Sequence, residues 1–136
     1  MTAVTQGRLA VGVLGAGPAA IAMAQALAGA GHLLVGIAPT AHEDRDRAEA
    51  MLQGVDILTV GEVLERGELV IIAVDERELV PTIGAISEEK LWKPGQLVAH
   101  TSPTYGFGVL SAAAQAGVVN MVNLSYRNVD RKSTRL

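Results

Sequence analysis

Short, continuous apolar segments alternate along the chain with longer segments in which apolar side chains recur at helical spacing. Continuous apolar segments of this length are typical of strands buried on both faces, as in a parallel sheet. Six strands are expected, at residues 9–14, 32–37, 55–58, 69–74, 97–101 and 118–122. Helices are expected between them, at residues 19–30, 41–52, 63–67, 75–89 and 110–116. The alternation predicts an α/β fold with a doubly wound parallel sheet.

Local signals mark where three of these helices begin. Thr40–Glu43 and Thr59–Glu62 each have the spacing of a capping box, in which the hydroxyl and the carboxylate bond to each other's free backbone N–H groups. Asp75 follows the fourth apolar segment and is suited to cap the helix after it. The pattern therefore places helix starts directly after several strand ends.

A glycine-rich turn follows the first apolar segment and opens the first helix. Gly15 permits a sharp turn out of the strand, and Gly17 has no side chain that would keep a ligand away from the backbone. Ala20 is small enough for the helix to lie close to the strand. A phosphate in front of this helix would meet free backbone N–H groups and the positive end of the helix dipole.

This segment matches the pattern G-x-G-x-x-[GA] within a strand, helix and second strand, and it predicts a dinucleotide-binding βαβ unit. The alternative is a tight turn with a purely structural role. The expected cofactor contacts in the turn are Gly15, Ala16, Gly17, Pro18 and Ala19. Ligands of doubly wound sheets bind outside the carboxyl ends of the strands, where the strand order reverses. Further cofactor contacts are therefore expected at Thr40, Arg45, Val74, Asp75 and Thr101, although capping is the favoured role for Asp75.

The residues after the second strand bear on the choice of dinucleotide. The segment from Ala38 to Thr40 carries no carboxylate of the kind that holds the ribose 2′-hydroxyl of NAD. NADP is therefore expected, with NAD as the alternative. The polar side chains that would accommodate a 2′-phosphate are Thr40, His42, Arg45 and Arg47. Alternatively, both arginines only pair with acidic neighbours on the helix surface.

His100 ends the fifth apolar segment at the same sheet edge and precedes two hydroxyl side chains, Thr101 and Ser102. A neutral imidazole there could relay a proton during reduction of a carbonyl or an imine. His100 and Ser102 are therefore the candidates for catalysis, with a structural role for His100 as the alternative. The three histidines lack paired ligand spacing, so no metal site is expected.

Composition narrows the class of protein. The 136 residues are 49% hydrophobic and carry a formal net charge of −3, which fits one domain with a real core and gives no electrostatic footprint for nucleic acid. There is no cysteine, so disulfides are excluded and a cytoplasmic location is expected. The uncharged stretch from Leu9 to His32 is interrupted by glycines and Pro18, which argues against a membrane span or a signal peptide.

We expect three parts along the chain. Residues 1–7 are polar, without periodicity, and are expected to be disordered. Residues 8–129 form the expected dinucleotide-binding domain. Residues 130–136 read as the one-frame translation of a widely used sequencing adapter, so we treat them as a non-native tail and the natural chain as cut short near Val129.

Two segments, RLAVGVLGAG at residues 8–17 and WKPGQLVAHTS at residues 92–102, resemble a bacterial family of Rossmann-like oxidoreductases. In this family the domain is joined to a helical C-terminal domain of unknown function. The family is similar to pyrroline-5-carboxylate reductase, ketopantoate reductase and the 6-phosphogluconate and 3-hydroxyisobutyrate dehydrogenases. The resemblance covers about residues 8–117 and implies a Rossmann NAD(P)-binding fold. It also implies a homodimer built through the missing C-terminal domain.

The chain departs from the family on the expected substrate side. Family members tend to have Pro-Asp after the fourth strand and Gly after His-Thr-Ser. Here Val74 leads directly to Asp75, and Ser102 leads to Pro103. Where the family would have a His-Pro pair after the last strand, the chain has Asn123-Leu124-Ser125.

The residues and the resemblance together predict the NAD(P)-binding domain of an oxidoreductase, truncated before its substrate domain. The complete enzyme would transfer a hydride between nicotinamide and a small carbonyl or imine substrate, and the fragment would bind cofactor without appreciable turnover. One alternative is a non-enzymatic nucleotide-sensing or interaction module of the same fold. Another is a flavin- or F420-dependent oxidoreductase.

Overall fold

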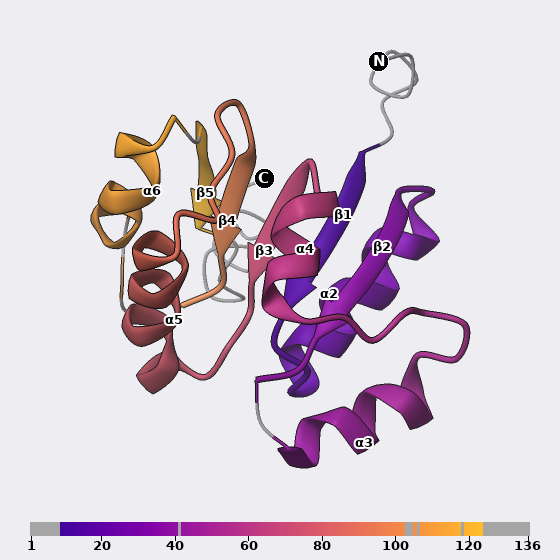
Figure 1. Ribbon diagram of the computed structural model, residues 1–136. Coiled ribbons are helices and arrows are strands. Elements are labelled where there is room, and N and C mark those ends of the chain that lie inside the picture. Colours follow the sequence, from indigo (N-terminus) through magenta and orange to yellow (C-terminus); the bar gives the residue numbers. More distant parts are fainter. Residues whose placement is uncertain (1–8, 41, 103–104, 106, 118, 124–136) are drawn as a thin grey trace, which may run out of the picture.

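The computed structural model describes residues 9–40, 42–102, 105, 107–117 and 119–123, and its described strands form one five-stranded sheet (Figure 1). The strand order is β2-β1-β3-β4-β5, and every neighbouring pair is parallel. The strands are β1 (Ala10–Leu14), β2 (Leu33–Ala38), β3 (Leu69–Ile72), β4 (Leu97–His100) and β5 (Val119–Asn123). Because β2 and β3 lie on opposite sides of β1, the strand order reverses at β1.

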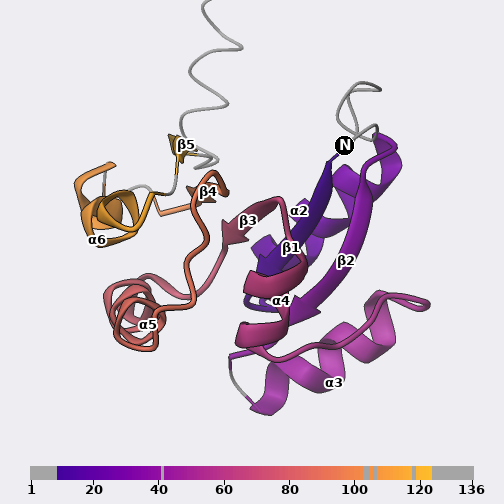
Figure 2. The same ribbon diagram turned by 45° about the horizontal axis from the view of Figure 1, so that its top comes forward.

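Helices cover both faces of the sheet (Figure 2). They are α2 (Pro18–Gly29), α3 (His42–Met51), α4 (Val60–Arg66), α5 (Glu76–Glu88) and α6 (Ser111–Gln115), the last preceded by the 3-10 turn η1 (Phe107–Leu110). One apolar cluster joins α2 and α3 to the sheet, and a second joins α4, α5 and α6 to the opposite face. The predicted α/β, doubly wound parallel sheet is therefore confirmed.

The alternation of side chains along β1 divides the core between these two layers. Val11 and Val13 pack in the cluster beneath α2, whereas Leu14 packs in the cluster beneath α4. Gly12 faces α4 at very close range, since a Cβ at this position would lie 2.5 Å from the Cγ1 atom of Val63. A larger residue at Gly12 would force the Val63 side chain or α4 itself to shift.

The prediction of a strand at residues 55–58 is wrong. Only one isolated bridge forms there, between Ile57 and Ile37 of β2. The Asp56 carbonyl accepts from the Ile37 N–H, and the Leu58 N–H donates to the Ile37 carbonyl. The chain then leaves the sheet at once because Thr59 caps α4. The described sheet therefore has β2 at its edge, and the strand expected at residues 69–74 is β3.

The remaining local predictions agree with the structure where its residues are described. The capping box of Thr59 and Glu62 is present in full, and Asp75 caps α5. Pro18 occupies the first turn of α2, and Pro81 lies inside α5. The expectations for residues 1–7 and 130–136, and the Thr40–Glu43 capping box with Ala41, lie outside the described residues.

A buried amide connects α4 to the start of β4. The side chain of Gln96 is only 4% exposed, and its Nε2 group donates to the carbonyls of Leu64, at 2.8 Å, and Gly67, at 2.9 Å. Its Oε1 atom accepts from the Lys93 N–H at 3.2 Å. This one side chain therefore satisfies polar backbone groups at the end of a helix and at the turn before a strand.

We expect Gln96→Ala to lower the free energy of unfolding by about 2 kcal/mol or more, because it leaves buried carbonyls without a donor. Chemical denaturation monitored by circular dichroism measures this change. Gln53→Ala, at an exposed position, is the matched control and is expected to stay within about 0.5 kcal/mol of the wild type. Equal stability of the two variants would contradict the role assigned to Gln96.

Candidate functional site

The turn between β1 and α2 is held against the segment that follows β3. Gly15 has a φ of +103°, and a Cβ there would lie 2.4 Å from the carbonyl oxygen of Ala73. Its N–H donates to the Ala38 carbonyl at 2.7 Å, which attaches the turn to the end of β2. Only glycine fits this position, for conformational and steric reasons together.

The N-terminus of α2 faces open space. Gly17 is the N-cap, no side chain caps the helix, and a Cβ on Gly17 would meet nothing within 4 Å. Behind the turn, Ala20 is fully buried, so the helix lies close to the sheet. The first-turn N–H groups of α2 are therefore not bonded to a capping side chain and carry the positive end of the helix dipole. This arrangement fits the phosphates of a dinucleotide.

A cavity of about 460 Å³ lies in front of this turn. It is bounded by the β1–α2 turn, the end of β2 and the start of α3, the β3–α5 segment and the end of β4. It therefore lies where the strand order reverses, the usual ligand position in doubly wound sheets. Its lining residues are Gly15, Ala16, Gly17, Pro18, Ala19, Thr40, Asp44, Arg47, Ala73, Val74, Asp75, Arg77, Glu78 and Thr101.

The structure brings nearly all of the predicted cofactor contacts to this one cavity: Gly15, Ala16, Gly17, Pro18, Ala19, Thr40, Val74, Asp75 and Thr101. Arg45 does not line it. The Arg45 guanidinium instead pairs with Glu49, one turn further along α3, at 3.4 Å, and both side chains are exposed. Helical geometry explains this, because Arg45 and Glu49 share an outer face of α3.

Arg47 is the α3 arginine that reaches the cavity. Its guanidinium pairs with Asp44 at 2.8 Å and donates to the Ala16 carbonyl, in the glycine turn, at 3.4 Å. The buried side chain of Ala48 is its neighbour on the helix. The helical spacing of residues 44, 47 and 48 was the sequence signal that could have separated Arg47 from Arg45.

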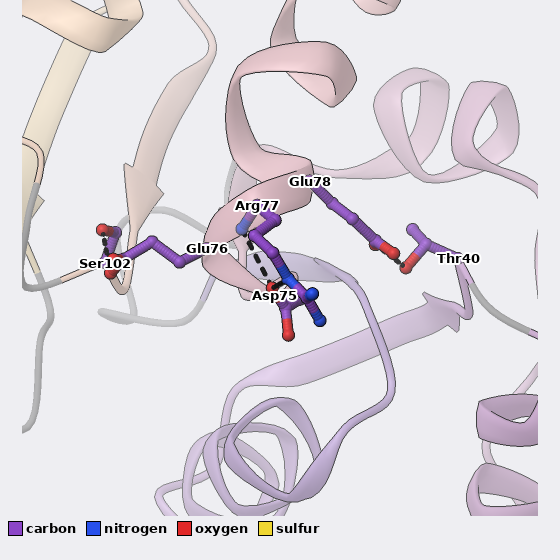
Figure 3. Close-up of polar contacts among 6 residues, drawn as sticks. All are labelled: Thr40, Asp75, Glu76, Arg77, Glu78 and Ser102. Atoms are coloured by element: carbon purple, nitrogen blue, oxygen red, sulfur yellow. Dashed lines mark hydrogen bonds and ion pairs between the residues drawn. The ribbon is translucent and has the colours of Figure 1, made fainter.

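Asp75 combines two positions, as the cap of α5 and as a wall of the cavity (Figure 3). Its Oδ1 atom accepts from the Arg77 N–H at 2.9 Å and from the Arg77 Nε at 3.3 Å. The backbone hydrogen bond, followed by the bond from the guanidinium, lowers the pKa of Asp75. The carboxylate is therefore ionised at neutral pH and bound to its own helix, as the capping interpretation predicted.

A second carboxylate of α5 reaches across the cavity. The Thr40 hydroxyl, just after β2, donates to the Oε1 atom of Glu78 at 2.9 Å (Figure 3). Glu78 and Arg77 also line the cavity, and neither was expected from the sequence. The contact joins residues that are 38 positions apart, and nothing local in the sequence indicates it.

His100 and Ser102 lie beside the cavity without lining it. The His100 side chain is fully buried on the same face of β4 as Val98, which packs in the cluster with α5. Its Nδ1 atom accepts from the Ser102 N–H at 3.2 Å. The Ser102 hydroxyl donates to Oε1 of Glu76 at 2.9 Å, at the start of α5 (Figure 3). Between them, Thr101 lines the cavity.

Within the part of the chain that the structure describes, no cluster of three or more His, Cys, Asp or Glu side chains is arranged to hold a metal ion. Among the same residues, no helix has both the length and the apolar character needed to cross a membrane.

Comparison with known families identifies the class that this fold and turn define. The chain belongs to the Rossmann-like domain family, whose match extends over residues 1–123. Solved structures with the same fold include an imine reductase and an NAD+-dependent dehydrogenase, and this likeness confirms the predicted Rossmann fold. A search of curated proteins found no match to the chain.

Three solved structures illustrate the likeness. An imine reductase from Pseudomonas sp. superposes with a TM-score of 0.65 and 20% identity, over 83% of this chain and 40% of its own. The imine reductase of Streptomyces aurantiacus superposes with a TM-score of 0.62 and 22% identity, over 82% of this chain and 39% of its own. A 5-dehydrogenase that acts on a pyridine carboxylic acid (FHMPC), described as an NAD+-dependent dismutase, superposes with a TM-score of 0.67 and 18% identity, over 82% of this chain and 43% of its own. The chain thus spans about two fifths of the length of these proteins.

The ionised state of Asp75 predicts a pH-dependent contribution to stability. A carboxyl whose pKa is lowered in the folded state stabilises it above the unfolded pKa of about 4, and this stabilisation is lost as the pH falls through the folded pKa. Asp75→Asn keeps a good N-cap but removes the charge. We therefore expect the wild type to exceed this variant in Tm at pH 7, and the difference to shrink toward pH 2.

Thermal unfolding at a series of pH values measures this difference. Asp75→Ser, a second uncharged cap, is expected to behave like Asp75→Asn. A difference in Tm that is constant from pH 7 to pH 2 would show that the charge of Asp75 is not part of the cap.

Proposed function

We propose that this chain is the cofactor domain of an oxidoreductase that transfers a hydride between a nicotinamide dinucleotide and a small carbonyl or imine substrate. The observation that carries the proposal is the open cavity in front of α2, where Gly15 and Gly17 bring bare backbone to the point at which the strand order reverses. The oxidoreductase neighbours of the same fold support the cofactor class.

The residues present fit a dinucleotide. The pyrophosphate would be held at the turn from Gly15 to Gly17, by the backbone N–H groups of the turn and of the first turn of α2. Val74 and Thr101 would form the wall at the ends of β3 and β4. When bound, the nicotinamide ring supplies the hydride chemistry, and the protein contributes binding, orientation and exclusion of water.

The substrate class is proposed from the similar structures. Two of the similar structures are imine reductases, which supports a substrate with a C=N bond for the complete protein. His100 and Ser102 remain the proposed candidates for proton transfer. Ser102 is bonded to Glu76, so its hydroxyl already has an acceptor for its proton.

We further propose that residues 8–129 are one domain of a longer enzyme and that residues 130–136 are not native to it. The two imine reductases are about twice as long as this chain, which leaves room in them for a substrate domain and for a homodimer contact outside the matched part. The enzyme would work in the cytoplasm. Sequencing the source locus past the Asn128 codon tests this arrangement directly.

The choice between NADP and NAD also belongs to this proposal. Thr40 and Arg47 line the cavity near the end of β2 and support the expected preference for NADP. The carboxylate of Glu78 accepts a hydrogen bond from Thr40, and its negative charge disfavours the 2′-phosphate of NADP. The preference for NADP stays a prediction, and tighter binding of NADH than of NADPH would contradict it.

Gly17→Asp tests the binding site with two readouts of opposite sign. The extended backbone of Gly17 and the open space around it suit an aspartate N-cap, so the variant is expected to fold at least as well as the wild type. Its carboxylate would face the pyrophosphate, so affinity for NADPH and NADH should fall by about tenfold or more. Fluorescence titration of both dinucleotides, together with Tm, measures these effects.

The matched control is Gly84→Asp, on α5, where a Cβ would also meet nothing within 4 Å and the residue does not line the cavity. This control should bind both dinucleotides like the wild type. Gly15→Asp should also abolish binding, but it strains the turn against Ala73, so its Tm will fall as well. Undiminished affinity in Gly17→Asp would refute the site.

A further inference from the structure

Thr40 and Glu78 both line the cavity and are joined by a hydrogen bond of 2.9 Å between Oγ1 and Oε1 (Figure 3). Thr40 follows β2, whereas Glu78 lies in the first turn of α5, beyond β3. The two residues therefore come from opposite sides of the point where the strand order reverses. The carboxylate stands where residues after β2 contact the adenosine ribose in dinucleotide-binding sheets.

The position of Glu78 is not explained by capping of its own helix. Glu62 has the same spacing from its cap, and there the carboxylate accepts from the Thr59 N–H at 2.9 Å while Thr59 Oγ1 accepts from the Glu62 N–H at 3.1 Å. In α5 the cap bond runs from the Arg77 N–H to Asp75 instead. The Glu78 carboxylate is thus bonded to Thr40 in the cavity lining rather than back to the start of its own helix.

The charges around Glu78 are already matched with one another. From α3, Arg47 pairs with Asp44 at 2.8 Å, and from α5, Arg77 pairs with Asp75 at 3.3 Å. Glu78 forms no ion pair within the described part of the chain, and its acceptor bond is to a neutral hydroxyl. A carboxylate of this kind keeps acceptor capacity for a hydroxyl donor and repels an anion.

We infer that Glu78 is a specificity-determining residue, whose carboxylate accepts a hydrogen bond from the ribose 2′-hydroxyl of NAD and weakens the preference for NADP that Thr40 and Arg47 support. The inference rests on the proposed function, because it concerns the same cavity. It supplies from α5 the carboxylate that is missing at Ala38 to Thr40. A 2′-phosphate would meet the negative charge of Glu78 and would compete with it for the single Thr40 proton.

The test compares the affinities of the 136-residue chain for NADH and NADPH, measured by fluorescence titration at low salt. Glu78→Gln keeps the size of the side chain and an oxygen that can accept from Thr40, but it removes the charge. The ratio of NADPH affinity to NADH affinity is expected to rise by about tenfold or more in this variant. Glu78→Ala should shift the ratio in the same direction and guards against a new contact of the glutamine amide.

Glu88→Gln is the matched control, since it makes the same change of charge at the exposed far end of α5, outside the cavity lining. Its ratio should equal that of the wild type. If the wild type binds both dinucleotides and neither Glu78 variant changes the ratio relative to Glu88→Gln, the inference is overturned and the proposed function stands. If the wild type binds neither dinucleotide, the proposed function is overturned and the inference with it.

Discussion

The site depends on one close approach, that of Gly15 to the backbone of Ala73. β1 is paired on both sides, so the chain can leave it only by turning sharply beneath the segment that follows β3. A side chain at Gly15 would separate these two segments, because even a Cβ would come within 2.4 Å of the Ala73 carbonyl. The contact holds the β1–α2 turn against the segment between β3 and α5, and both segments line the cavity.

The N-termini of α2 and α5 face the same cavity but are capped differently. α2 begins at Gly17 without a capping side chain, whereas α5 begins at Asp75, whose carboxylate accepts from the Arg77 N–H. The first turn of α2 therefore keeps N–H groups that no side chain caps, whereas at α5 the Arg77 N–H is bonded to the Asp75 carboxylate. The asymmetry places uncapped backbone N–H groups on one side of the cavity and carboxylates on the other.

Local and repeated patterns made most of the fold predictable. Continuous apolar segments identified β1, β2, β3 and β4, and the Thr59–Glu62 spacing identified the start of α4 because capping boxes form within four residues. Residues 55–58 were misassigned because strand pairing depends on a neighbour that the pattern does not contain. The glycine turn was predictable for the same local reason, but the Thr40–Glu78 contact was not, since it joins distant elements.

The cavity lining has a further consequence for cooperativity. Its residues come from the glycine turn, from the end of β2 and α3, from the segment between β3 and α5, and from the end of β4, so the cavity exists only when all of these segments are docked. A ligand there would bind the folded chain and not the unfolded one, and at a hundred times its Kd it would add about 2.7 kcal/mol to stability by mass action. With ligand bound, the elements on either side of β1 could not open locally without releasing it, so the local unfolding of the two sides would become coupled.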